Sequence, residues 1–99
     1  MKNYMISTTD GLSLLHTFRE DEEAEVAALT AALSSLGKGL KKGIDIGDLG
    51  TIVINGSKGR YGVRYIDQKH ILGVLATDGM SEQRLVADIE AMVFSIQNN

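Results

Sequence analysis

Hydrophobic and polar residues alternate at the start of the chain. The alternation runs over residues 2–8 and resumes over residues 12–18, after a tight turn at Asp10-Gly11. Asp-Gly is typical of such turns because glycine adopts positive φ without a steric penalty. These residues predict a β-hairpin.

Helical spacing follows the hairpin. Asp21 can cap a helix that Gly43 can close. A helix N-terminus favours the carboxylates of Glu20, Asp21, Glu22, Glu23 and Glu25, and its C-terminus favours Lys38, Lys41 and Lys42. One apolar stripe consists of Val26, Leu29, Leu33, Leu36 and Leu40. Opposite it lies a stripe of small residues, namely Ala24, Ala28, Ala31, Ser35 and Gly39.

The second half of the chain predicts three strands and a closing helix. Residues 51–55 form a β-branched strand, and a turn separates them from a strand at residues 61–66. Residues 71–76 are apolar on both faces, which indicates a central strand covered above and below. Ser81 is a good N-cap for the last helix. The predicted order is β-β-α-β-β-β-α.

Composition narrows the class of protein. A chain of 99 residues is expected to form one domain, residues 1–99, whose small aliphatic core is often completed by association. The net charge of -3, with dispersed basic residues, argues against nucleic-acid binding. There is no cysteine for a thiolate metal site or nucleophile. No apolar run suggests a signal peptide or membrane insertion, so we expect a cytoplasmic protein.

The order of elements resembles the roadblock/dynein-light-chain family. The likeness covers nearly the whole chain and rests on the order and spacing of four segments. These are the hairpin at residues 5–12, the small-residue helix at 24–40, the strand and turn from residue 50, and residues 71–79. Family members begin with a helix before the first strand, whereas this sequence starts inside that strand. The missing helix is expected to leave apolar surface uncovered, so that something else covers it or the oligomer differs.

This resemblance implies a roadblock/profilin-like α+β sandwich with a five-stranded antiparallel sheet. It also implies a homodimer that pairs through the long helix and an edge strand. By spacing alone, the small stripe is slightly better explained as a solvated face rich in helix formers. The resemblance reverses that preference. The predicted strand at residues 51–55 has no charge, proline or bulge that would protect its edge from pairing with another strand. The expected interface is therefore Ala24, Ala28, Ala31, Ser35, Thr51, Ile52, Val53, Ile54 and Asn55.

Other polar groups have simpler explanations than chemistry. Lys58, Arg60, Arg64 and Lys69 are a candidate rim for an acidic partner, although most such groups are merely solvated. The Gly-rich turn that precedes residue 61 leads into a strand and not a helix, so it does not match a phosphate loop. His16 and His70 have no metal-ligand spacing. We expect no catalytic residues, no cofactor and no metal.

The function implied by the resemblance is regulation by contact. We expect a homodimer, or a higher oligomer, that binds a Ras-like small GTPase or its complex without donating catalytic groups. The first alternative is a structural adaptor that joins subunits of a larger assembly with no GTPase role. The second is an enzyme or ligand sensor, which would need convergent polar groups that the sequence does not supply.

Overall fold

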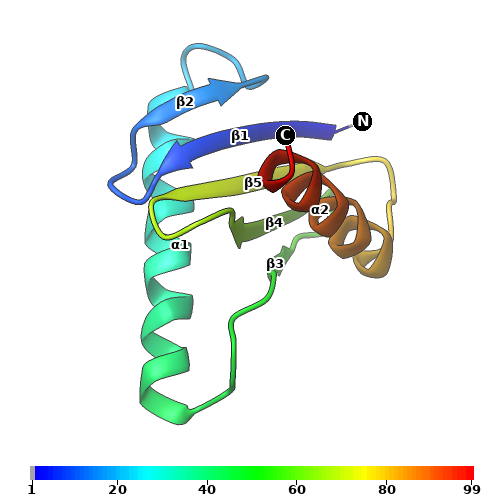
Figure 1. The fold of residues 1–99 in the computed structure, drawn as a ribbon. Helices are drawn as coiled ribbons and strands as arrows, with labels where there is room; N and C mark the ends of the chain where they lie inside the picture. The colour runs from blue at the N-terminus through cyan, green and yellow to red at the C-terminus, as the bar shows by residue number, and fades with distance from the viewer. Residues whose placement is uncertain (1) are drawn as a thin grey trace.

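The computed structural model describes residues 2–99 as five strands and two helices (Figure 1). The elements are β1 (Lys2–Thr8), β2 (Ser13–His16), α1 (Glu23–Ile44), β3 (Ile52–Asn55), β4 (Arg60–Tyr65), β5 (His70–Ala76) and α2 (Glu82–Gln97). The strands form one antiparallel sheet in the order β2-β1-β5-β4-β3. The predicted order of elements and the five-stranded antiparallel sheet are therefore confirmed.

Local signals in the sequence locate most element ends. The hairpin turns at Gly11, whose φ is 89° and whose amide donates to the Thr8 carbonyl. Ser81 caps α2 by accepting from the Arg84 amide at 3.1 Å. The predicted cap of α1 is wrong, because Glu22 occupies the N-cap and the Asp21 carboxylate instead binds the Arg19 guanidinium.

The end of α1 and the extent of β2 differ from the predictions, and the last three strands are each shifted by one residue at one or both ends. Gly43 does not close α1, which continues to Ile44 and ends where Asp45 adopts a left-handed φ of 49°. A short polar side chain tolerates that conformation better than most. The second strand covers only Ser13–His16 and not the whole of residues 12–18.

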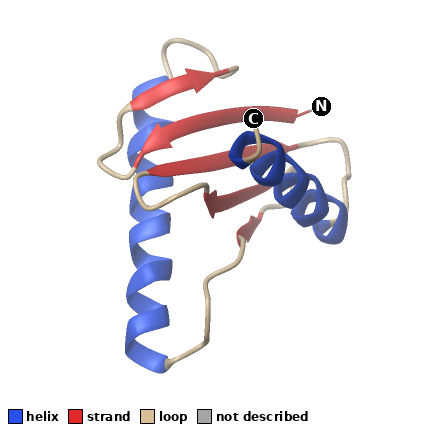
Figure 2. Ribbon diagram, viewed as in Figure 1, coloured by secondary structure: helices blue, strands red, loops and turns tan. Residues whose placement is uncertain are grey.

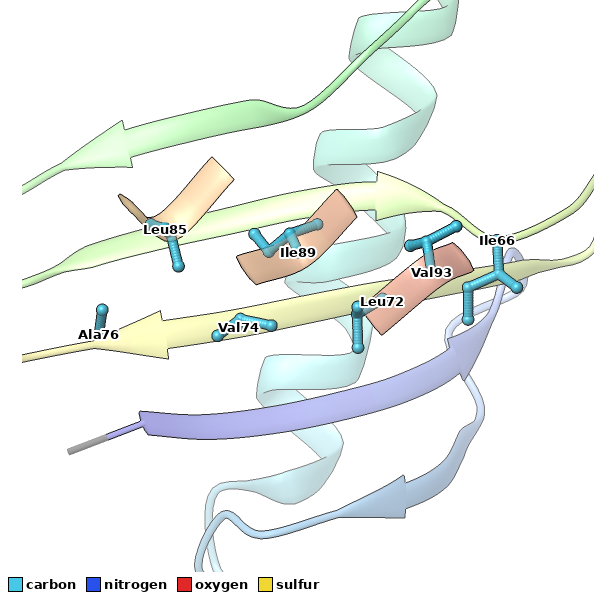
Figure 3. Packing of buried hydrophobic residues seen from close by; sticks show 7 residues of the cluster. All are labelled: Ile66, Leu72, Val74, Ala76, Leu85, Ile89 and Val93. Carbon is cyan, nitrogen blue, oxygen red and sulfur yellow. The ribbon is translucent and has the colours of Figure 1, made fainter. Parts of the chain in front are cut away.

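The two helices cover opposite faces of the sheet (Figure 2). On the α2 face, the core consists of Ile66, Leu72, Val74, Ala76, Leu85, Ile89 and Val93 (Figure 3). On the α1 face, a smaller cluster joins Ile71 to Val63 and Ala31. Ile71 and Leu72 are both fully buried, one on each face. The doubly apolar strand is thus the central β5, as predicted.

Helix α1 packs on the sheet mainly through small residues; among its leucines, Leu33 is partly buried against the core cluster, whereas Leu29, Leu36 and Leu40 are exposed. Its buried positions are Ala27, Thr30, Ala31, Ser34 and Gly37. Large tyrosines of β4 fill the space that these small residues leave, and the Tyr65 hydroxyl donates to the Ser34 carbonyl at 3.1 Å. The Thr30 hydroxyl donates to the Val26 carbonyl, so it accepts from the Tyr61 hydroxyl, 2.6 Å away.

Tyr61 is held in this position from both sides. Gly73 lies beneath its ring, and a Cβ at that position would approach Tyr61 Cζ to 2.7 Å. Burial raises the pKa of the Tyr61 phenol, and the Thr30 hydrogen bond offsets only part of that effect. The hydroxyl therefore stays neutral at ordinary pH and anchors α1 to β4.

Candidate self-association surface

Strand β3 is an edge strand without the usual protection. It pairs only with β4, in a regular register from Ile52 opposite Val63 to Asn55 opposite Arg60. No residue of β3 is charged, and Ile54 is 48% exposed. Natural sheet edges usually carry a charge, a proline or a bulge, because unpaired backbone groups otherwise attract another strand. The outer side of β3 is therefore available for pairing.

The leucine stripe lies on one flank of α1, where Leu29 and Leu33 line an apolar hollow together with Ile54 of β3. Leu29, Leu36 and Leu40 are 57%, 67% and 56% exposed. The hollow between this flank and the sheet measures about 520 Å³. It is lined by Phe18, Glu22, Val26, Leu29, Leu33, Ile54, Tyr61 and Leu75. Exposed apolar surface of this extent is typical of sites that another polypeptide covers.

The last turns of α1 extend past the sheet. A Cβ on Gly37 would lie 2.6 Å from the Ile52 side chain, so α1 crosses β3 at this point. The helix continues to Ile44, and at about 1.5 Å per residue this part projects about 10 Å beyond the last strand (Figure 1). We call residues 39–44 the overhang. All of its residues are exposed, including Leu40 and Ile44.

The predicted small-residue stripe lies on the other flank of α1. Ala31 is only 9% exposed and belongs to the core, so the stripe is not one exposed face. Ala24, Ala28 and Ser35 are exposed. A Cβ on Gly11 would lie 3.5 Å from Ala28 Cα, which places this flank beside the β1–β2 turn and not beside Ile54. In a single copy, the small-residue flank and Ile54 of β3 therefore lie on different sides of α1.

The candidate basic rim is dispersed over the molecule. Arg60 donates to the Met80 carbonyl, and Arg64 lies 3.2 Å from the Thr51 hydroxyl and 3.7 Å from Glu90. Lys58 lies in the β3–β4 turn and Lys69 in the β4–β5 turn, at opposite ends of β4. Two of the four cations thus hold structural contacts, and no single rim results.

The structure brings together one polar cluster that sequence spacing did not predict. Ligand atoms of His16, Glu20 and Glu23 lie within 4.8 Å of one another, and His16 Nε2 is 3.2 Å from a Glu23 oxygen. Within residues 2–99, His16 Nδ1 is buried without a hydrogen-bond partner. A histidine that ligates a metal usually donates its other N–H to an acceptor. The cluster is better explained as a polar contact between His16 of β2 and Glu23 at the start of α1.

A second apolar groove lies on the α2 face. It measures about 350 Å³ and is lined by Tyr4, Ile6, Leu15, Leu72, Met92, Ser95 and Ile96. In the part of the chain that the structure describes, no helix is long and apolar enough to cross a membrane.

These features define a class of small α/β sandwiches that carry one open sheet edge beside an exposed apolar helix flank. The family model of the Roadblock/LC7 domain matches residues 1–76. The chain belongs to the Roadblock/LC7 domain family, as the resemblance indicated.

Solved structures share the fold at low sequence identity. A Roadblock/LC7 domain from Streptomyces avermitilis is 23% identical with a TM-score of 0.86, covering 97% of this chain and 82% of that chain. MglB from Myxococcus xanthus is 15% identical with a TM-score of 0.85, covering 97% and 80%. A structure of MglB with a tetrameric arrangement is 12% identical with a TM-score of 0.81, covering 97% and 74%. A comparison with curated proteins found no match.

Proposed function

We propose that this protein is a non-catalytic homodimer that serves as a docking platform for a Ras-like small GTPase or its complex. The observation that carries the dimer is the unprotected β3 edge, which lies directly beside the exposed leucines of α1. Membership of the Roadblock/LC7 domain family supports the regulatory role, because the resemblance points to adaptors and regulators. A higher oligomer remains part of the proposal through the groove on the α2 face.

The dimer would form by antiparallel pairing of two β3 strands about a two-fold axis. Such an isologous contact joins the same surface on both copies and makes one continuous sheet of the two. The strand contributes no charge that the partner strand would repel. Beside it, the leucine flanks of the two α1 helices would cover each other.

Light scattering over a range of concentrations tests the dimer directly. We expect the wild type to have twice the mass of one chain, and Ile54→Lys to have the mass of one chain, because a buried lysine on the edge strand leaves an unpaired charge. Leu14→Lys is the matched control, since Leu14 is 51% exposed on the opposite edge strand, β2. Equal masses for the wild type and Ile54→Lys would contradict this interface.

The GTPase role needs a separate measurement. Ras-like GTPases from the same cells should be purified in the GDP state and in a GTP-analogue state, and titrated with the wild type and with Ile54→Lys by calorimetry. We expect one of them to bind the dimer in a nucleotide-dependent manner and to bind the monomeric variant more weakly. If none binds while the protein co-purifies with a larger assembly that lacks a GTPase, the structural adaptor is the correct function.

A further inference from the structure

The overhang, residues 39–44, is a helical segment with little to hold it. Nothing from elsewhere in the chain lies within 4 Å of a Cβ placed on Gly39 or Gly43. Among the described contacts of its side chains, one ion pair joins Lys41 to Asp48 at 3.4 Å, and that aspartate is fully exposed. Surface ion pairs of this kind contribute little to stability. Leu40 and Ile44 are 56% and 65% exposed, so they also gain little from their own chain.

Its sequence is also a poor helix former. Glycine in an exposed helix interior is about as unfavourable as any residue except proline, because its backbone loses the most freedom on folding. Two of the six overhang residues are glycines. Short helices without tertiary contacts are marginal in water even when their sequences are favourable. The packed part of α1 before residue 38 does not share this weakness, because it is seated on the sheet.

A second copy is the occupant that fits this segment. The overhang projects about 10 Å past β3, which is about two strand spacings of roughly 4.8 Å. If two β3 strands pair, these are the positions of β3 and β4 of the second copy. The apolar hollow lined by Ile54 also lies beside α1, and Leu40 and Ile44 are exposed apolar side chains of the overhang that a second copy would cover.

We infer that the overhang folds stably only on the second copy, so that its folding controls the strength of self-association. This inference rests on the proposed dimer. A monomer with an unfolded overhang must fold it before the apolar contacts form. Only the fraction of monomers with a folded overhang can bind, and the smaller this fraction is, the higher the apparent dissociation constant becomes. Gly39 and Gly43 set that fraction. The dimer is thereby kept weaker than its buried surface alone would make it.

Replacing each glycine by alanine tests the inference. Gly39→Ala and Gly43→Ala place a methyl group in open space and favour the helix by about fivefold per copy, the factor that corresponds to about 1 kcal/mol. Each dimer contains the substitution twice, so we expect the dissociation constant from analytical ultracentrifugation to fall by up to about thirtyfold. Ser35→Ala is the control, because Ser35 is exposed on the other flank of the packed part of α1.

The outcomes separate the inference from the proposed function. If the overhang is already folded in the monomer, both glycine variants stabilise monomer and dimer equally and leave the dissociation constant unchanged, which would overturn the inference alone. A wild type that stays monomeric at every concentration would overturn the dimer itself. An effect of Ser35→Ala as large as that of the glycine variants would also count against the inference.

Hydrogen exchange gives an independent readout. In the monomeric Ile54→Lys variant, we expect amides of residues 40–46 to exchange without protection while those of residues 30–37 stay protected. In the wild-type dimer, both segments should be protected. Equal protection of residues 40–46 in the dimer and in Ile54→Lys would show that the overhang needs no second copy.

Discussion

The two edges of the sheet are built differently. Strand β2 has four residues, and its pairing with β1 shifts register between Ile6 and Ser7. Residues 17–22 connect it to α1 and arch over that side of the sheet in Figure 1, carrying Glu20 and Asp21. Both edge strands have four residues, so length does not distinguish them. A bulge and nearby charge are usual protections of an edge strand, and β2 has both. Strand β3 has a regular register and no charged residue, so the two edges differ in whether they can accept another strand.

The two ends of α1, which lie near the two edges of the sheet, also carry different residues. At the β2 edge the helix begins with carboxylates, one of which binds His16 across the gap. At the β3 edge the helix ends with exposed leucines that extend past the sheet. The comparison teaches that one helix can close one edge and leave the other open for a partner.

The largest expected effect comes from disrupting the packing of α1 on the sheet at Tyr61. Gly73→Ala would force the Tyr61 ring away and break its hydrogen bond to Thr30, because the new methyl group overlaps the ring. Overpacking of this kind costs about 3 kcal/mol, so we expect Tm to fall by about 10–20 °C in a thermal melt followed by circular dichroism.

Ser35→Ala is the control for this melt, since Ser35 is exposed on α1. The dissociation constant of any dimer should rise in Gly73→Ala, because α1 no longer holds its leucines beside β3. A Tm equal to that of the wild type would mean that Tyr61 does not fix the position of α1 on the sheet.

The next largest effect is expected from substitutions that compare the leucine flank of α1 with its small-residue flank. Leu36 and Ser35 are neighbours in sequence, both exposed, and lie on opposite flanks. Leu36→Glu should weaken the dimer by about thirtyfold or more, the equivalent of about 2 kcal/mol for one buried leucine. Ser35→Glu should leave the dissociation constant unchanged in sedimentation experiments. The reverse result would return the interface to the small-residue stripe.

A smaller effect concerns how β4 holds α1 near the open edge. Tyr61→Phe removes one hydroxyl, while Thr30 keeps its bond to the Val26 carbonyl. We expect a loss of about 1 kcal/mol in the free energy of unfolding, measured with urea. The loss should be the same at pH 6 and pH 8, because burial raises the pKa of Tyr61 and keeps the phenol neutral. A loss that changes between these pH values would contradict that assignment.

The sequence predicted the order of elements but not which side of α1 faces the sheet. Periodicity ranks the leucines as the core stripe because they are bulky and regularly spaced. In the structure, Tyr61 and Tyr65 reach across from β4 and occupy the space, so only small residues fit opposite them. The signal was present in the combination of small residues at Thr30, Ser34 and Gly37 with two tyrosines on one predicted strand. Reading it required knowing which strand lies under the helix.

The candidate surface shows the same limit. Strand β3 was predicted from its β-branched residues, which are a property of the local sequence. The expectation that its edge pairs came from the resemblance and from the absence of charge, proline or a bulge. The overhang was not predicted, because its length past the sheet depends on where α1 crosses β3. That crossing is fixed by Gly37 against Ile52, a contact between residues far apart in the chain. The contact of His16 with Glu23 was missed for another reason, since it joins the end of β2 to the start of α1 across a loop and follows neither strand nor helix spacing.

The smallest expected effect concerns the protected half of the sheet. Lys2 of β1 binds Asp88 of α2 at 3.1 Å, and this hydrogen bond is the main cause that lowers the pKa of Asp88. A carboxyl whose pKa is lower in the folded state contributes stability above its unfolded pKa of about 4, and loses it as the pH falls through the folded pKa. Because the pair is largely exposed, its contribution is well under about 1 kcal/mol.

Asp88→Asn should therefore lower the free energy of unfolding slightly at pH 6, and the difference from the wild type should shrink as the pH falls to 3. Urea denaturation at both pH values measures this difference. The dissociation constant of the dimer should not change at pH 6, since Lys2 and Asp88 join β1 to α2 and lie away from β3. A weaker dimer in Asp88→Asn would show that the two halves of the sheet are coupled, and that the open edge depends on the protected one.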